Sequence, residues 1–365
     1  MLYRLATGDS SRRHIVVSLM DEAEFGPMLR TANIEVHALD MPSGRVTWKG
    51  LSRLYRLIKQ EQPFIIQTWL YHADFLGGIL GRLAGNVGVV WGLHYSELDK
   101  SDLSLATRLV MWLCARMSAV LPHRIISCSE RGRTLHLERG YEPVRTIFVP
   151  NGYDFAKFLP EAQAGQDLRS QWRVADDELL IGMAARWDPQ KGHTTLFEAL
   201  QMLAGLDVGP WRCVLFGDEI DESNSALMAA IERYGIGDHL MLLGHRSDMP
   251  AVLSALDVHV LSSAFGEAFP NVLIEAMACG TPCVATDVGD AVNMLGDVGY
   301  SVPRQNPEAL CGALVQVGKD VQNKDMWELK MDACRKHVLE RYSLQTMVDA
   351  YGAVWAEAAQ GQGDQ

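Results

Sequence analysis

Two cations spaced five residues apart are the first candidates for chemistry in this sequence. Arg186 and Lys191 lie in ARWDPQKG (185–192), between the apolar run LLIGMA and a helical pattern that starts at residue 193. A loop between a strand and a helix can bring a planar guanidinium and a compact ammonium onto one diphosphate. The two charges would then stabilise a diphosphate leaving group without a metal. The alternative is a pair of ordinary exposed loop charges.

Two carboxylates follow in the segment SSAFGEAFPNVLIEAMACGTP, residues 262–282, which comes directly after the apolar run VHVLSS. The segment predicts a loop at the carboxyl end of a strand, where doubly wound sheets bind ligands, and then a helix from about Asn271. The unpaired amides of that helix's first turn suit a phosphate. Glu275 is placed to accept from two ribose hydroxyls, and Glu267 lies where a sugar would follow the phosphates. A capped helix with incidental carboxylates is the alternative.

Histidines end two apolar runs in the first half of the chain. His72 follows FIIQTW, and His94 follows GVVWGL. If these strands are parallel, both histidines lie at the ligand-binding edge of the sheet, where they would meet a sugar hydroxyl or an acceptor. A structural or merely exposed loop histidine is the alternative for each.

The elements that must position these residues are short β-branched runs alternating with helical patterns. This alternation predicts parallel sheets covered on both faces by helices, in two doubly wound Rossmann-like domains of an α/β fold. In the first half the expected strands are 14–19, 64–69, 88–93, 124–129 and 146–152. In the second half they are 179–184, 212–217, 240–244, 258–263 and 282–287.

The 365 residues are enough for two domains, each with its own core. The turn-forming Pro150-Asn151-Gly152 predicts a boundary that separates an N-terminal domain, 1–150, from a C-terminal domain, 151–340, with a cleft between them. Residues 341–365 are expected to form a helix that crosses back to the first domain and ends in a polar tail.

Charge is unevenly distributed along the chain, whose net charge is −12. Residues 1–150 carry 18 Lys and Arg against 14 Asp and Glu, whereas the remainder carries 15 against 31. The basic half is therefore the candidate for peripheral contact with the inner face of the cytoplasmic membrane, with a solvated helix face as the alternative. An acidic chain without aromatic-interleaved basic runs argues against nucleic-acid binding.

No signal peptide or membrane-spanning run is indicated, and the seven scattered cysteines are typical of buried, reduced thiols in a cytoplasmic protein. Cys279 and Cys283 have no second Cys or His pair nearby, so no metal site is expected. The sequence also lacks the Walker-type GxxxxGK[ST] and a GxGxxG at the start of a helix, which argues against nucleotide hydrolases and dehydrogenases.

The motifs ARWDPQKG, LGHRSD (243–248), SSAFGEAFPNVLIEAMACGTPCVATDVGD and VPNGYD (149–154) resemble those of the retaining GT-B glycosyltransferases of family 4. The resemblance covers nearly the whole chain and is most specific from Ala185 to Gly289. It implies a GT-B fold and transfer of a sugar from a nucleotide-sugar, such as a UDP- or GDP-sugar, with no other cofactor. The implied acceptor is a glycan or a lipid-linked glycan of bacterial polysaccharide or lipopolysaccharide synthesis.

Site residues follow from the resemblance by position. It implies that Arg186 and Lys191 hold the donor diphosphate, that Glu275 binds the ribose, and that Glu267 and His94 touch the transferred sugar. Further donor contacts are implied at Ala268, Phe269, Pro270, Asn271, Val272, Leu273, Gly217, Gly244, His245 and Arg246. The implied mechanism is retaining and metal-independent: the acceptor hydroxyl attacks the face from which the diphosphate leaves, and catalysis consists of positioning and charge stabilisation.

Two departures from the family pattern stand out. The chain has Glu267-Ala268 where the family usually has Glu-Gly, which adds a methyl group at the sugar edge. The family also begins with a strand and a glycine-rich loop, whereas here the helix-like MLYRLATG precedes the first expected strand. The sequence therefore leaves two other functions open: a nucleotide-sugar epimerase of the same fold, and an inactive nucleotide-sugar-binding protein.

Overall fold

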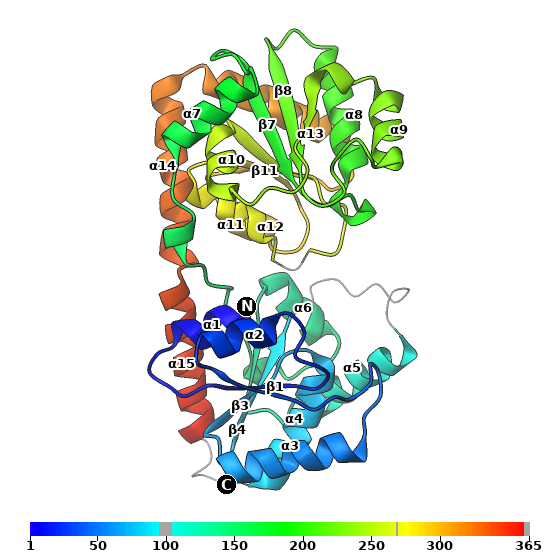
Figure 1. Cartoon of the computed structure of the whole chain (residues 1–365), viewed down its shortest axis with the longest axis vertical. Coiled ribbons are helices and arrows are strands. Elements are labelled where there is room, and N and C mark those ends of the chain that lie inside the picture. The colour runs from blue at the N-terminus through cyan, green and yellow to red at the C-terminus, as the bar shows by residue number, and fades with distance from the viewer. Residues whose placement is uncertain (86, 95–103, 268, 361–365) are drawn as a thin grey trace. The chain divides into compact units, whose positions relative to one another are not determined.

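The computed structural model describes residues 1–85, 87–94, 104–267 and 269–360. The chain divides into two compact units, each described here by itself. Unit 1 comprises Met1–Tyr153 and the C-terminal segment from Tyr342, and unit 2 comprises Asp154–Arg341. Both units consist of parallel strands with helices between them (Figure 1), as the alternating pattern predicts.

The described residues of unit 1 form two parallel sheets. The strands are β1 (Ile15–Ser18), β2 (Glu35–Ala38), β3 (Ile65–Gln67), β4 (Gly88–Leu93), β5 (Arg124–Ser127) and β6 (Thr146–Phe148). The helices are α1 (Leu2–Gly8), α2 (Phe25–Thr31), α3 (Trp48–Glu61), α4 (Tyr71–Ala84), α5 (Leu105–Met117), α6 (Glu130–Glu138), the 3-10 turn η1 (Pro143–Arg145) and α15 (Leu344–Gln360). β1 pairs with β2, while β3, β4, β5 and β6 form a separate sheet in that order.

The start of the chain is helical, as the sequence indicates. Residues 1–14 are all described and contain α1 but no strand, so β1 is the first strand. The buried Leu5 of α1 packs in one core with Val90 of β4 and Tyr351 of α15. Within the described residues, helix α1 therefore precedes the first strand.

β4 is the most deeply buried strand of unit 1, because both faces of its sheet are covered. Val89 and Trp91 pack among residues of α4 and α5, whereas Val90 faces the core formed with α15. The chain returns to unit 1 at Tyr342, whose carbonyl accepts from the Tyr153 N–H at 2.8 Å. The helix that follows, α15, was expected to cross back to the N-terminal half, and it packs there on β3 and β4.

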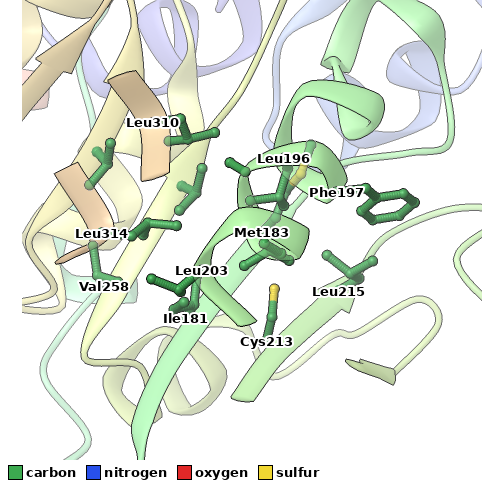
Figure 2. Packing of buried hydrophobic residues seen from close by; sticks show 14 of the residues in the cluster. Ile181, Met183, Leu196, Phe197, Leu203, Cys213, Leu215, Val258, Leu310 and Leu314 are labelled. Atoms are coloured by element: carbon green, nitrogen blue, oxygen red, sulfur yellow. The ribbon is translucent and has the colours of Figure 1, made fainter. Parts of the chain in front are cut away.

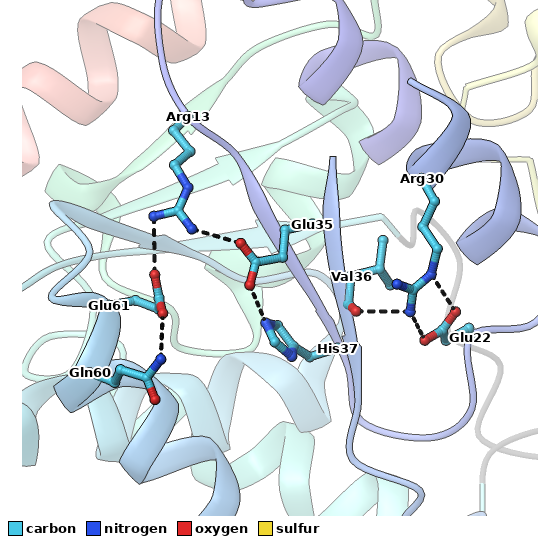
Figure 3. Close-up of polar contacts among 8 residues, drawn as sticks. All are labelled: Arg13, Glu22, Arg30, Glu35, Val36, His37, Gln60 and Glu61. Atoms are coloured by element: carbon cyan, nitrogen blue, oxygen red, sulfur yellow. Dashed lines mark hydrogen bonds and ion pairs between the residues drawn. The ribbon is translucent and has the colours of Figure 1, made fainter. Parts of the chain in front are cut away.

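β2 is an edge strand, and charged side chains cover it (Figure 3). Arg30 pairs with Glu22 and also donates to the Val36 carbonyl of β2 at 3.1 Å. Arg13 bridges Glu35 of β2 and Glu61 of α3, at 2.6 and 3.1 Å. Such charges at a sheet edge oppose pairing with another chain.

Unit 2 has one six-stranded parallel sheet in the order β12-β11-β10-β7-β8-β9. Its strands are β7 (Leu179–Ala184), β8 (Trp211–Phe216), β9 (Leu240–Leu242), β10 (Val258–Leu261), β11 (Cys283–Thr286) and β12 (Tyr300–Val302). The α-helices are α7 (Ala162–Gln171), α8 (His193–Ala204), α9 (Ser225–Tyr234), α10 (Met249–Ala255), α11 (Asn271–Ala278), α12 (Ala291–Leu295), α13 (Pro307–Val321) and α14 (Lys324–Arg341). The 3-10 turns are η2 (Phe155–Lys157), η3 (Pro189–Lys191) and η4 (Gly237–His239).

The main core of unit 2 lies between this sheet and the helices α8 and α13. Figure 2 shows Met183 of β7 and Leu215 of β8 packed near Leu196 of α8, with Leu310 and Leu314 of α13 beside them. These side chains are completely or almost completely buried. The core fixes the strand ends from which the candidate site is built.

Candidate functional site

The loop that carries Arg186 and Lys191 has a defined local structure. β7 ends at Ala184, and Asp188 then caps the turn η3 by accepting from the Gln190 N–H at 2.8 Å. The pKa of Asp188 is lowered, first by this N–H and then by Arg186 and Lys191. Both cations therefore act electrostatically on the Asp188 carboxylate, and their convergence on a diphosphate remains a prediction.

Lys191 and Glu267, predicted from separate motifs, are in direct contact. The Lys191 Nζ lies 2.6 Å from the Glu267 Oε1, and the two side chains are only 20% and 10% exposed. The hydroxyl of Ser263 donates to the same carboxylate oxygen at 2.8 Å. The pair is thus largely removed from solvent. A charge–charge contact in such a buried position is screened less than one at the surface.

Backbone contacts hold the two loops together beneath this pair. The Ala264 N–H donates to the Gln190 carbonyl at 2.8 Å, and the Ser262 hydroxyl donates to the Lys191 carbonyl at 3.0 Å. Gly192 has a positive φ of 66°, and a Cβ at this position would lie 2.1 Å from the Ser262 carbonyl oxygen. Only glycine fits this close approach.

Helix α11 begins at Asn271, as expected, with Pro270 at its N-cap. Asn271 is exposed and Val272 and Glu275 are half-buried, whereas Leu273 is fully buried. The Leu273 N–H donates to the Pro270 carbonyl at 3.2 Å, so a donor contact at this residue remains a prediction. Phe269 and Pro270 are buried as well, and the predicted contact at Ala268 lies outside the described residues.

The glycine turns after β8 and β9 are joined to each other. The Gly217 N–H donates to the Gly244 carbonyl at 2.9 Å, and Trp187 donates its N–H to the Asp218 carbonyl at 3.0 Å. A Cβ on Gly217, whose φ is 144°, would lie 2.4 Å from the Ala185 carbonyl oxygen. The turn after β8 therefore runs directly along the loop that leads to Arg186.

The two side chains predicted at the nucleobase are fixed by neighbouring carboxylates. The His245 Nδ1 lies 2.9 Å from the Asp218 Oδ1, and the Arg246 Nε donates to Asp248 at 2.9 Å. Both side chains of the first pair are about three-quarters exposed, so His245 is open to a ligand. The role of these residues remains a prediction.

His94 belongs to unit 1, where it stacks on Trp69 with ring centroids 4.8 Å apart. Its Nε2 is buried and has no hydrogen-bond partner among the described residues. Burial first, and then the positive chain N-terminus, lower the pKa of His94 to about 4. The contact of His94 with the transferred sugar remains a prediction.

Two serines have contacts in this site that the sequence did not predict. Ser262 and Ser263 stand in the quoted motif, but no residue pattern there indicates what their hydroxyls contact. Their hydroxyls meet the Lys191 carbonyl and the Glu267 carboxylate. The signal available was their position at the carboxyl end of a strand, next to the predicted loop.

We expect stability to fall below pH 6.5, because three histidines are buried in their neutral form. Burial lowers the pKa of His136 and His193 to about 4 and that of His259 to about 3. Below pH 6.5 the unfolded chain binds protons that the folded chain excludes, so stability is fully present above that pH and decreases toward pH 4. Each histidine should lower the free energy of unfolding by about 2 kcal/mol between pH 6.5 and pH 5.

Urea unfolding at a series of pH values measures this effect. His245→Gln, which changes a histidine at the surface rather than a buried one, is the control. An unfolding midpoint that stays constant down to pH 5 would contradict the expectation.

Comparison with known proteins places the chain among glycosyltransferases. Residues 178–320 match the family described as Glycosyl transferases group 1, and residues 2–157 match Glycosyltransferase Family 4. The chain is 24% identical over 304 residues to the Escherichia coli UDP-Gal:alpha-D-GlcNAc-diphosphoundecaprenol alpha-1,3-galactosyltransferase, covering 82% of this chain and 77% of that enzyme.

Of two further matches, one covers less than half of this chain and the other covers nearly all of it. The phosphatidyl-myo-inositol mannosyltransferase of Mycobacterium leprae is 32% identical over 175 residues, but the match covers only 46% of this chain and 43% of that enzyme. The crystal structure of Anabaena Alr3699/HepE in complex with UDP superimposes with a TM-score of 0.83 at 22% identity, over 97% of this chain and 94% of that one. That likeness establishes the fold. The chain therefore belongs to glycosyltransferase family 4 and has its GT-B fold of two Rossmann-like domains.

Proposed function

We propose that this glycosyltransferase moves a sugar from a nucleotide-sugar to a glycan or lipid-linked acceptor, with retention of anomeric configuration, in the synthesis of bacterial surface polysaccharide or lipopolysaccharide. The observation that carries the proposal is the contact between Lys191 and Glu267 at adjacent strand ends, with Arg186 on the same loop. A cation and a carboxylate in one largely buried contact suit a diphosphate bonded to a sugar.

In this proposal each charge has a separate partner on the donor. Lys191 and Arg186 bind the diphosphate oxygens, and Glu267 accepts from hydroxyls of the sugar. Arg186 is now paired with Asp188 at 3.0 Å and is about half exposed, so it can turn to a phosphate without leaving a buried charge unpaired. Glu275 binds the ribose, while the loop with His245 packs on the base.

Retention follows if the acceptor attacks from the side on which the diphosphate departs. The acceptor oxygen forms a bond to the anomeric carbon as the bond from that carbon to the diphosphate breaks. The departing phosphate oxygen takes the acceptor's proton, so no side-chain nucleophile is needed. Arg186 and Lys191 stabilise the charge that develops on the leaving group, which is the work a divalent metal would otherwise do.

A lipid-linked acceptor is proposed because the Escherichia coli relative is named for an acceptor on diphosphoundecaprenol. The base of the donor is proposed to be uracil, because that relative is named for UDP-Gal and the Anabaena structure holds UDP. His94 is assigned to the transferred sugar, as the family resemblance implies.

Donor binding is tested by thermal denaturation with UDP-, GDP- and ADP-sugars in the presence of EDTA. One nucleotide class should raise the melting temperature in a concentration-dependent way, because a ligand stabilises the folded state that binds it. The double variant Glu275→Ala, Lys191→Ala should lose this shift. Equal binding by parent and variant would contradict the assignment of the site.

Turnover assays separate the two alternative functions. An epimerase would change the donor with no acceptor present, and an inactive binding protein would bind the donor without turnover in the presence of lipid-diphosphate acceptors. Transfer that needs the acceptor, continues in EDTA and gives an α-linked product from an α-linked donor would support the proposal.

We also propose peripheral contact with the membrane through unit 1. No helix in the described part of the chain has the length and apolarity to cross a bilayer. On α5, Leu105, Leu109 and Trp112 are 80%, 57% and 54% exposed, and they follow helical spacing on one side. Arg116 stacks over Trp112 at 5.5 Å. An exposed apolar stripe that ends in an aromatic ring and a cation suits the interface of an anionic bilayer.

The basic residues of α3 add to this surface. Lys49, Arg53, Arg56 and Lys59 are exposed along α3, and α4 packs against both α3 and α5. The double variant Leu109→Glu, Trp112→Glu should lose most of its flotation with vesicles containing anionic phospholipid. Leu329→Glu, at an exposed leucine of unit 2, is the control that should float like the parent. Equal flotation of both variants would contradict the contact.

A further inference from the structure

The candidate site lies above the seam between β7 and β10. β7 has β8 on one side and β10 on the other, so the chain's winding direction reverses at this seam. The register of β7 with β8 runs from Leu179 to Ala184, but its register with β10 covers only Val258 and His259. The two strands therefore separate early, below the loops that carry the site.

Two side chains accept hydrogen bonds from β7 on either side of this short pairing. Near the amino end of β7, the Leu180 N–H donates to the Oδ2 of Asp257, the residue before β10, at 2.7 Å. At the carboxyl end of β7, the Ala184 N–H donates to the Nε2 of His259 in β10 at 3.2 Å. A side-chain acceptor thus replaces a strand carbonyl at the point where the strands part.

The hydrogen bond between Ala184 and His259 lies just before both loops that carry the site residues. Ala184 is the last residue of β7 and lies two positions before Arg186. From His259 of β10 the chain continues to Ser262 and Ser263, the serines that contact Lys191 and Glu267. If β7 and β10 moved relative to each other at this point, the distance between the side chains of Lys191 and Glu267 would change.

Histidine is a costly residue at this position, because the rest of the strand is apolar. His259 is fully buried between Val258 and Val260, and its Nδ1 has no hydrogen-bond partner among the described residues. An apolar side chain would avoid the burial of an imidazole with one unsatisfied nitrogen. The compensating contact is the acceptor offered to Ala184, which requires the neutral ring with its proton on Nδ1. Burial lowers the pKa of His259 to about 3, so the ring keeps this form at neutral pH.

We propose that His259 is a positioning residue for the donor site: its imidazole holds the end of β7 against β10 and thereby sets the Arg186–Lys191 loop relative to Glu267. The inference rests on the proposed function, because it assumes that these side chains bind a nucleotide diphosphate. It assigns His259 no contact with the donor.

The test compares three variants by their dissociation constant for UDP and their melting temperature. His259→Phe fills the space without an acceptor, whereas His259→Gln brings an amide oxygen that can accept from Ala184. Asp257→Leu removes the equivalent acceptor near the amino end of β7 and also the pair with Arg169 at 3.0 Å. It is therefore a control for loss of stability away from the site. If His259→Phe does not fold, His259→Met, with a more adaptable apolar side chain, replaces it.

We expect His259→Phe to weaken UDP binding about 10-fold and His259→Gln to stay within about 3-fold of the parent. Asp257→Leu should lower the melting temperature and leave UDP binding unchanged. The proposal is overturned if His259→Phe binds UDP like the parent, or if both destabilised variants lose binding in proportion to their loss of stability. The parent is measured first: if it binds no UDP-, GDP- or ADP-sugar, the proposed function itself fails.

Discussion

Lys191→Met lowers kcat/KM for sugar transfer by about 10²–10³-fold, the effect of removing one group that stabilises a developing negative charge. Methionine keeps an apolar stem of similar length and removes only the ammonium. The loss should appear mainly in kcat, because the charge on the diphosphate increases as the bond to the sugar breaks. Initial rates at several donor concentrations, with a fixed lipid-diphosphate acceptor, measure it.

A second ion pair of unit 2 supplies the control for this variant. Arg212 and Glu178 are 3.2 Å apart and partly buried, at the amino ends of β8 and β7 rather than at their carboxyl ends. Arg212→Met should lower the melting temperature while kcat/KM stays within about 2-fold of the parent. If Lys191→Met retained full kcat, the charge-stabilising role of Lys191 would be wrong, whatever its effect on stability.

Gly192→Ala destabilises unit 2 by about 3–5 kcal/mol, since the new methyl group meets two separate penalties. The backbone at Gly192 has a φ of 66°, which a residue with a Cβ adopts at a cost. The Cβ would also lie 2.1 Å from the Ser262 carbonyl oxygen, so the loops after β7 and β10 would be forced apart. A fall in melting temperature of about 10 °C or more, with loss of nucleotide binding, is the expected result.

A second glycine, Gly235, allows the cost of the positive φ to be measured apart from the cost of the steric contact. Its φ of 63° is nearly the same, but a Cβ there would meet no atom within 4 Å. Gly235→Ala should therefore cost only about 1–2 kcal/mol and leave nucleotide binding intact. Equal melting temperatures for the two variants would show that the close approach to Ser262 contributes nothing to stability.

The strands that the sequence predicts well are those buried on both faces. GVVWGL and LLIGMA are continuous apolar runs, and they form β4 and β7 over the predicted residues. β2 and β12 were not predicted, because Glu35–Ala38 and Tyr300–Val302 are short and mix polar with apolar residues. Both are terminal strands of their sheets, where one edge has no partner strand and the apolar pattern is weaker.

Of the candidate site, the sequence supplied the residue types and their places on loops. Arg186, Lys191, Glu267 and Glu275 were selected from charge and spacing next to predicted strands. The contact between Lys191 and Glu267 could not be predicted from spacing, because 75 residues lie between them and it depends on β7 and β10 being neighbours. The acceptor role of His259 was missed for the same reason: a histidine in an apolar run gives no sign of which backbone group it meets.

The sequence by itself determined the α/β class, the two-domain organisation of the family and the loops that carry the charged residues, because these follow from local periodicity and from motifs within a few tens of residues. Only the tertiary structure decided the strand order, which strand ends meet, and which carbonyl a glycine must approach. These features depend on contacts between residues far apart in the chain, for which local propensity carries no information. The sequence therefore identifies the residues of the site, and the order of the strands sets the distances between them.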